Sequence, residues 1–233
     1  MKNLKFESIV ILAGLLLLGI NIKFGLEAIG KNERSVNVKG LAEMEVPANV
    51  VTWPIAYKLL GNDLTRIYSE IKSSNQIIID FLKSKGLEKQ EIIVNSPNII
   101  DLKADRYSNY KDVNSRYNIT TVITVKSNKI DLVRKLISEQ SELLRRGIAT
   151  VTGYEYNVNY EYTELNKIKP QMIEEATKNA RKTAEKFAKD SDSELGKIQR
   201  ASQGQFSISD SDATTPHIKH IRVVTSITYS LED

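Results

Sequence analysis

Apolar and polar residues follow three patterns along this chain of 233 residues. Residues 9–20 (IVILAGLLLLGI) form an unbroken apolar run behind two lysines, Lys2 and Lys5. Beyond Ser35, several stretches alternate apolar and polar positions, which is the period of a β-strand, and three stretches repeat apolar residues at helical spacing. The patterns therefore predict an apolar N-terminal helix within residues 1–30, followed by one domain of mixed helices and strands at 31–233.

The predicted elements of this domain follow the order ββαββαβαββ. Alternation predicts strands beginning at Val36 and at 50–60, 91–100, 117–125, 154–162, 197–208 and 221–231. Helical spacing predicts helices at 64–86, 133–147 and 170–190, with Pro170 opening the last one. Because strict alternation of strand and helix is absent, we expect an α+β fold in which helices cover a mixed or antiparallel sheet.

Two of the predicted helices have apolar faces that we expect to pack on the sheet. In the middle helix the inward residues are expected to be Val133, Leu136, Ile137 and Leu144. In the last helix the expected buried residues are Ile173, Ala176, Ala180, Ala184 and Phe187. The three alanines predict that this helix approaches the sheet closely.

Pro54 marks the predicted strand at 50–60 as unusual. Proline has no N–H to donate to a neighbouring strand, so this strand is expected to lie at a sheet edge or to contain a bulge. An open edge near Trp53 and Pro54 is a candidate interface between copies of the chain. The polar residues 101–116 are expected to form a mobile hairpin loop.

Tyrosines recur at every second position of the predicted strand at 154–162. Tyr154, Tyr156, Tyr160 and Tyr162 are expected on one face, with Val158 between them. This face is either core packed under a helix or an exposed surface that serves an interface, since tyrosine combines an apolar ring with a polar hydroxyl.

The N-terminal segment predicts targeting to a membrane. A basic start before an apolar run is typical of an export signal, and the lysines are expected to stay in the cytoplasm. One interpretation is an uncleaved signal-anchor, in which the span continues through Ile22, Phe24 and Leu26. The other is a signal peptide cleaved near Ala28 and Gly30. Both place residues 31–233 outside the inner membrane.

Composition excludes several classes of protein. The net charge is +4, and the basic residues are not concentrated in one stretch, so nucleic-acid binding is not expected. The absence of cysteine excludes disulfides, thiolate catalysis and cysteine-bound metals.

Few residues suggest catalytic or metal-binding chemistry. His217 and His220 are three positions apart, which points them to opposite faces of a strand, so we interpret them as surface residues rather than metal ligands. Residues 209–212 (SDSD) lack the glycine and the final glutamate of a calcium loop and are expected to form a polar turn. Neither a P-loop nor a hydrolase elbow is present. We therefore expect no enzyme activity, no cofactor and no metal.

Two stretches resemble the SIMPL-domain family. Val38-Lys39-Gly40, followed by Ala48-Asn49, is similar to the family's opening strand, although Asn49 stands where an aspartate is usual. The alanine-spaced helix through Ala176, Ala180 and Ala184, and the exit at residues 195–198 (LGKI), are similar to its second motif, although Asp192 stands where glycine is common. The resemblance covers about residues 34–232. It implies an α+β fold in the bacterial envelope and no known reaction.

These observations together predict a non-catalytic, self-associating binding or structural module outside the inner membrane. Homo-oligomers are expected, with the membrane contacted through the N-terminal helix. The alternative is an accessory protein in envelope stress that binds a small ligand or a peptide, and an enzyme of unknown type is the third possibility.

Overall fold

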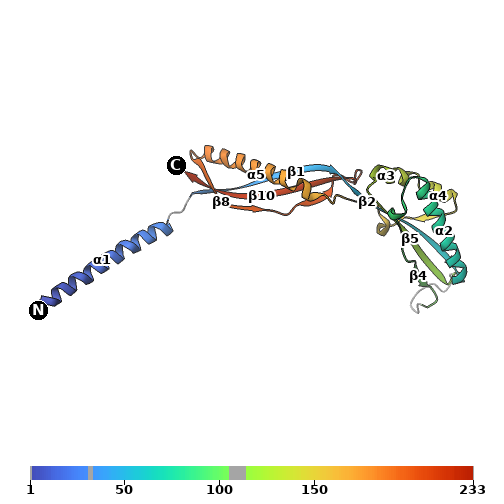
Figure 1. Ribbon diagram of the computed structural model, residues 1–233, viewed down its shortest axis with the longest axis horizontal. Coiled ribbons are helices and arrows are strands. Elements are labelled where there is room, and N and C mark those ends of the chain that lie inside the picture. The colour runs from blue at the N-terminus through green and yellow to red at the C-terminus, as the bar shows by residue number, and fades with distance from the viewer. Residues whose placement is uncertain (1, 31–33, 105–113, 233) are drawn as a thin grey trace. The chain divides into compact units, whose positions relative to one another are not determined.

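The computed structural model describes residues 2–30, 34–104 and 114–232, with the side chains of the first helix described at 9–23. The chain divides into two compact units (Figure 1). We call the first the terminal unit; it comprises Met1–Ala42, Ile173–Gln205 and Val223–Asp233. The second, the central unit, comprises Glu43–Met172 and Phe206–Arg222.

Helices and strands alternate irregularly along the chain, which confirms an α+β fold. The helices are α1 Lys2–Gly30, α2 Leu64–Ser84, α3 Ile130–Ser138, α4 Ser141–Arg145 and α5 Leu165–Asp190, with short 3-10 turns η1 Lys89–Glu91 and η3 Tyr154–Tyr156. The strands are β1 Ser35–Pro47, β2 Val50–Gly61, β3 Ile92–Val94, β4 Asn98–Asp101, β5 Tyr117–Ser127, β6 Thr150–Val151, β7 Asn159–Glu161, β8 Glu194–Gln203, β9 Ser207–Asp210 and β10 Ile218–Glu232.

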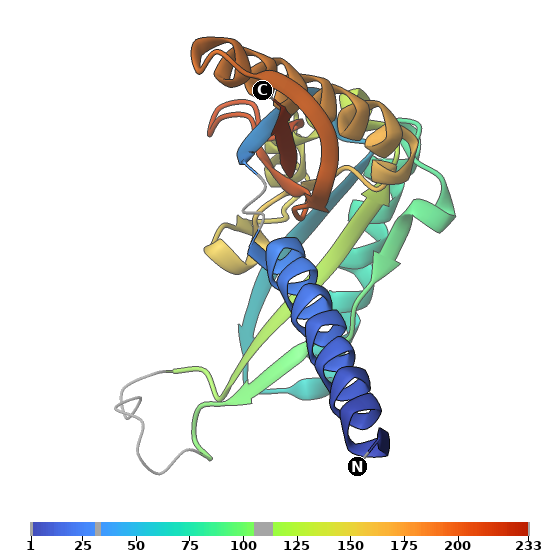
Figure 2. The same ribbon diagram turned by 90° about the vertical axis from the view of Figure 1, so that its left-hand side faces the viewer.

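The central unit is built on a six-stranded sheet in the order β3-β5-β2-β6, in which β4 also pairs with β5 and β7 with β2. Every pairing in it is antiparallel. The longest runs between β2 and β5 and joins Val51–Gly61 to Tyr117–Ser127. Helix α2 lies along these two strands (Figure 2).

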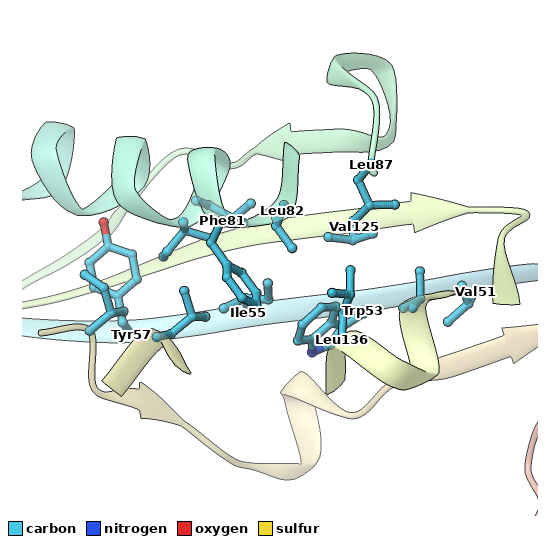
Figure 3. Close-up of a cluster of buried hydrophobic side chains, with 14 of the residues drawn as sticks. Val51, Trp53, Ile55, Tyr57, Phe81, Leu82, Leu87, Val125 and Leu136 are labelled. Carbon is cyan, nitrogen blue, oxygen red and sulfur yellow. The ribbon is translucent and has the colours of Figure 1, made fainter. Parts of the chain in front are cut away.

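One face of β2 and β5 forms the core of this unit (Figure 3). Trp53, Ile55 and Tyr57 on β2 are at most 2% exposed, and Ile123 and Val125 on β5 are fully buried. Against them pack Ile78, Phe81 and Leu82 of α2 and Val133 and Leu136 of α3. The period of two in the strands and the helical spacing in α2 therefore meet in one cluster, as the sequence predicts.

Helix α2 begins and ends where its sequence indicates. The Asp63 side chain accepts hydrogen bonds from the N–H groups of Thr65 and Arg66 at 2.8 and 3.3 Å, and so caps the helix. Beyond the helix, Gly86 has a φ of +103°. Glycine adopts this left-handed conformation with little strain because it has no Cβ, and it commonly ends a helix.

The terminal unit packs α5 on a second antiparallel sheet in the order β1-β10-β8 (Figure 1). Strand β9, which also pairs with β10, belongs to the central unit. Ala180 and Ala184 of α5 are fully buried and contact a cluster that contains Val38, Ile227 and Tyr229. The predicted alanine stripe of this helix is therefore confirmed.

Gly40 explains why this helix carries alanines. A Cβ built at Gly40 would lie 1.8 Å from the carbonyl oxygen of Ala176 and 2.8 Å from the Cβ of Ala180. Strand β1 and helix α5 thus touch backbone to backbone, and this approach requires glycine on the strand and alanine on the helix.

Helix α1 carries apolar side chains on every side along its described residues, with Ile9, Leu15 and Leu18 each about 60% exposed. Within the part of the chain that the structure describes, no helix reaches the length and apolarity needed to cross a membrane. The prediction of a spanning anchor finds no support in this result.

Three expectations about helices are wrong. Helix α5 begins at Leu165, so Pro170 lies inside it rather than at its start, at the loss of one intrahelical hydrogen bond. Phe187 is 56% exposed, because the buried stripe advances by four residues from Ala184 to Ala188. The predicted middle helix is broken into α3 and α4, and this break turns Leu144, 65% exposed, toward solvent.

Two predicted strands are interrupted. The stretch 91–100 divides into β3 and β4 around Pro97, and the stretch 197–208 divides into β8 and β9 around Gly204. The predicted mobile loop at 101–116 falls mostly at 105–113, outside the described residues.

Candidate functional site

One border of the six-stranded sheet consists of two short apolar strands, β3 and β4. Strands β3 and β4 pair with β5, and no further strand of the described chain pairs with them. Large apolar side chains along this border are about half exposed: Ile93 46%, Val94 48%, Ile99 52% and Ile100 47%. Neighbouring residues of a strand point to opposite faces, so the border is apolar on both of its faces.

Proteins usually protect such borders with charged residues, prolines or very short strands. Here β3 has no charged residue, and the one charged residue of β4 is Asp101 at its end. Pro97 and the brevity of the strands give further protection. Between the strands, the backbone N–H of Asn95 donates to the carbonyl of Val122 at 3.1 Å, and its side chain donates to Thr124 Oγ1 at 3.0 Å. The break is therefore anchored to β5.

An apolar groove of about 380 Å³ lies between this border and the start of α2. Its lining residues are Leu64, Thr65, Tyr68, Ile71, Pro97, Ile99 and Ile119. Leu64 is 44% exposed and Tyr68 68% exposed, although both are large side chains with mostly apolar surface. We call Leu64, Tyr68, Ile93, Val94, Ile99 and Ile100 together the apolar edge surface.

Charged groups lie beside this surface in pairs. The Arg116 guanidinium donates to both carboxylate oxygens of Asp101, the last residue of β4, at 2.9–3.2 Å. These hydrogen bonds from Arg116 hold the pKa of Asp101 below its ordinary value. On α2, Arg66 pairs with Glu70 at 2.9 Å. Because these charges are paired, the surface carries little net charge to repel an identical copy.

The predicted interface at Trp53 and Pro54 is not at a sheet edge. Strand β2 pairs with β5 on one side and with β6 and β7 on the other, and Trp53 is 2% exposed. Pro54 is tolerated because it falls between Thr52, paired with β7, and Ala56, paired with β6. The prediction that β2 lies at a sheet edge is therefore wrong. Pro54 instead faces a gap between the two neighbouring strands, β6 and β7, where no N–H is needed for pairing.

The four tyrosines do not form one face. Tyr154 and Tyr156 belong to η3, and the only strand in the stretch is β7, Asn159–Glu161. Tyr154 is 95% exposed, whereas Tyr160 is 8% exposed and packs edge-on against His217 at 6.1 Å between ring centroids. Tyr156 and Tyr162 are half-buried. The predicted regular strand is wrong, and only Tyr160 has the core role that was one of the two interpretations.

The candidate metal-binding residues have other partners. His220 Nε2 lies 3.9 Å from Glu43 Oε1, Asp210 pairs with Lys219, and Asp212 accepts hydrogen bonds from Thr214 and Thr215. The hydrogen bonds from Thr214 and Thr215 hold the pKa of Asp212 far below its usual range. Among the described residues, no three histidine, aspartate or glutamate side chains gather as metal ligands would.

Sequence reasoning missed the apolar edge surface, although a signal was present. Ile92-Ile93-Val94 and Ile99-Ile100 are consecutive apolar residues in strands, so some of them must lie on the outer face. Leu64 lies at the first position of α2 and is partly exposed.

The comparisons with known proteins agree with the motifs in the terminal unit. No curated protein matches the chain significantly. The SIMPL family, described as a protein of unknown function (DUF541), matches residues 36–228. Gly40 comes from the first stretch that resembles this family and Ala180 from the second, and the fold brings them into contact. Because the match covers most of the chain, this protein belongs to the SIMPL family.

Proposed function

We propose that this protein is a non-catalytic, self-associating module of the bacterial cell envelope, and that its copies meet through the apolar edge surface. The observation that carries the proposal is the border of the six-stranded sheet, where Ile93, Val94, Ile99 and Ile100 are 46–52% exposed. Large apolar side chains gathered along one border, rather than scattered singly, are typical of protein interfaces.

A second copy of the chain is the occupant that this surface fits best. The border offers the unpaired backbone groups of β4 together with apolar side chains, and an identical β4 offers the same groups in return. Two identical strands can pair antiparallel about a two-fold axis, which gives a closed dimer with equivalent contacts on both sides. Tyr68 and the groove beneath it would receive side chains of the second copy.

The envelope location is supported by the N-terminal sequence. Lys2 and Lys5 precede the apolar run at 9–20, as in export signals. Self-association in the envelope needs only a weak interface if copies are confined near a membrane surface, because confinement raises their effective concentration. The proposed absence of catalysis rests on the sequence, which carries no hydrolase or phosphate-binding motif.

The proposal is tested by sedimentation of the full-length protein at tens of micromolar in a mild detergent. Wild type is expected to sediment as an oligomer and Ile99→Lys as a monomer, because a lysine at a strand border opposes pairing with another strand. Leu144→Lys is the matched control: Leu144 is 65% exposed and belongs to helix α4, not to the apolar edge surface, so its variant should assemble like wild type.

A monomeric wild type would contradict self-association. The alternative of an accessory protein that binds a small ligand or a peptide would then take first place. Equal loss of assembly in Ile99→Lys and Leu144→Lys would show that the interface lies elsewhere than on the apolar edge surface.

A further inference from the structure

A second cavity in the central unit lies beside Trp53, away from the apolar edge surface. Its volume is about 190 Å³. It is lined by Trp53, Pro54, Ala56, Ile137, Gln140, Val151, Thr152, Gly153, Tyr156, Asn157 and Val158. For comparison, an engineered apolar cavity of about 150 Å³ in another protein binds benzene. The cavity beside Trp53 is therefore large enough for a small organic molecule.

The cavity exists because the strand beside β2 is interrupted. Strand β6 pairs with Ala56 and Tyr57, and β7 pairs with Val50–Thr52, so the pairing on this side of β2 is missing between them. The chain leaves the sheet after Val151 and passes through η3 before it returns as β7. Pro54 lies in this gap and has no N–H that a neighbouring strand would need to satisfy. The interruption thus opens a space without leaving a donor of Pro54 unpaired.

Trp53 brings an unpartnered donor to this space. Its side chain is 2% exposed, yet no described residue accepts a hydrogen bond from the indole N–H. The nitrogen is not one of the fully enclosed polar atoms that lack a partner, and Trp53 lines the cavity. In Figure 3 the nitrogen lies on the side of the ring away from Val125. A buried tryptophan usually finds an acceptor for this group.

The other lining residues restrict which kind of ligand could supply an acceptor for the indole N–H. None of the residues that line the cavity is charged, so a charged ligand would lose its hydration without gaining a counter-ion. Pro54, Ala56 and Val158 contribute apolar surface. Gln140 lines the cavity too, and its amide nitrogen already donates to Thr150 Oγ1 at 2.7 Å.

We propose that this cavity is a binding site for a small uncharged molecule with an apolar body and an oxygen atom that accepts a hydrogen bond from the Trp53 indole N–H. The apolar body lies against Ile137 and Val158, which pack against the same buried cluster as Trp53. The site is independent of self-association, because none of its lining residues belongs to the apolar edge surface.

Trp53 is the one tryptophan of the chain, so it reports binding directly. The full-length protein labelled with nitrogen-15 gives a single indole N–H signal in a proton–nitrogen correlation spectrum. Acetophenone, which has an aromatic body and a ketone oxygen, is the probe. Titration is expected to move this signal downfield and to saturate at millimolar concentration. An unmoved signal would overturn the proposal and leave water as the acceptor.

The contribution of the N–H is isolated by a pair of probes of equal size. Cumene has the shape of acetophenone without the oxygen, and a net hydrogen bond should favour acetophenone by about three- to tenfold. In Trp53→Phe, measured by ligand-observed saturation transfer, this preference should fall to about one. A preference that survives in the folded variant would show that Trp53 is not the donor.

A second variant keeps the test valid if Trp53→Phe does not fold. Thr152 lines the cavity and is exposed, so Thr152→Phe should block the cavity without disturbing the core. Glu155→Phe is the matched control, since Glu155 is exposed on η3 and does not line the cavity. Acetophenone is expected to shift the indole signal of Glu155→Phe and not that of Thr152→Phe. Equal shifts in both variants would place the probe outside this cavity.

Discussion

The contrast between Tyr154 and Tyr160 shows how far residues of one type can differ within one short stretch. Tyr154 is 95% exposed on η3, whereas Tyr160 is 8% exposed on β7. Val51 of β2 pairs with Tyr160, and the tyrosine ring belongs to the same buried cluster as Phe81 and Leu136. Burial also raises the pKa of the Tyr160 hydroxyl.

Replacing these two tyrosines should therefore have opposite consequences. Tyr160→Ser is expected to lower the free energy of unfolding by about 2–4 kcal/mol, because it removes a buried ring and leaves a cavity. Tyr154→Ser should change it by less than about 0.5 kcal/mol. Urea denaturation followed by circular dichroism measures both. Equal effects would mean that the two rings are buried to the same extent, contrary to their exposures.

At the scale of elements, the contact between β1 and α5 depends on Gly40. Gly40→Ala would place a methyl group 1.8 Å from the carbonyl oxygen of Ala176, which is backbone and cannot rotate away. We expect the variant to lose about 2 kcal/mol or more of stability as α5 is displaced. Thermal unfolding followed by circular dichroism measures the loss.

Gly153→Ala is the matched control for this prediction. A Cβ at Gly153 meets its nearest neighbour at 3.6 Å, an ordinary contact, and its φ of −177° is open to any residue. Its melting temperature should stay close to that of wild type. A Gly40→Ala variant as stable as wild type would contradict the close approach of helix and strand.

The elements that the sequence predicted well are those whose pattern and burial coincide. Strand β5 alternates along its whole length, with Ile119, Ile123 and Val125 buried, and α2 combines a clear apolar stripe with a capping Asp63. The stretch at 154–162 alternates equally well, but only Asn159–Glu161 pairs with a neighbouring strand. A period of two is necessary for a strand, and a partner strand is needed too.

The candidate surfaces could not be predicted for a related reason. Whether a strand lies at a border depends on the order of strands in the sheet, which the pattern of one strand does not contain. Pro54 predicted that its strand lies at a border. In the structure the strand is central, and Pro54 lies opposite the gap between its neighbours β6 and β7. Consecutive apolar residues in β3 and β4 were the signal of the true border. The cavity beside Trp53 depends on η3, which no local pattern indicated.

At the scale of the whole molecule, the two units differ in the features they contain. The terminal unit contains Val38-Lys39-Gly40 and the alanine-spaced helix that resemble the SIMPL family, and it contains the close contact of Gly40 with Ala176 and Ala180. Ala48-Asn49, the rest of the first stretch, belongs to the central unit. The central unit contains both the apolar edge surface and the cavity beside Trp53.

Location outside the inner membrane is a property that the N-terminal segment predicts for the whole chain. Lys2 and Lys5 before the apolar run at 9–20 predict export, so an added protease should digest residues beyond 31 in spheroplasts while a cytosolic marker stays intact. Mass spectrometry of the N-terminus then separates the two forms of export: a chain that begins near Lys31 has lost a signal peptide, and a chain that keeps Lys2 retains the N-terminal segment as an anchor.

A variant with Leu16→Arg and Leu17→Arg should stay in the cytosol, because charges within the apolar run oppose insertion. Protection of the wild-type chain equal to that of the cytosolic marker would contradict export in either form.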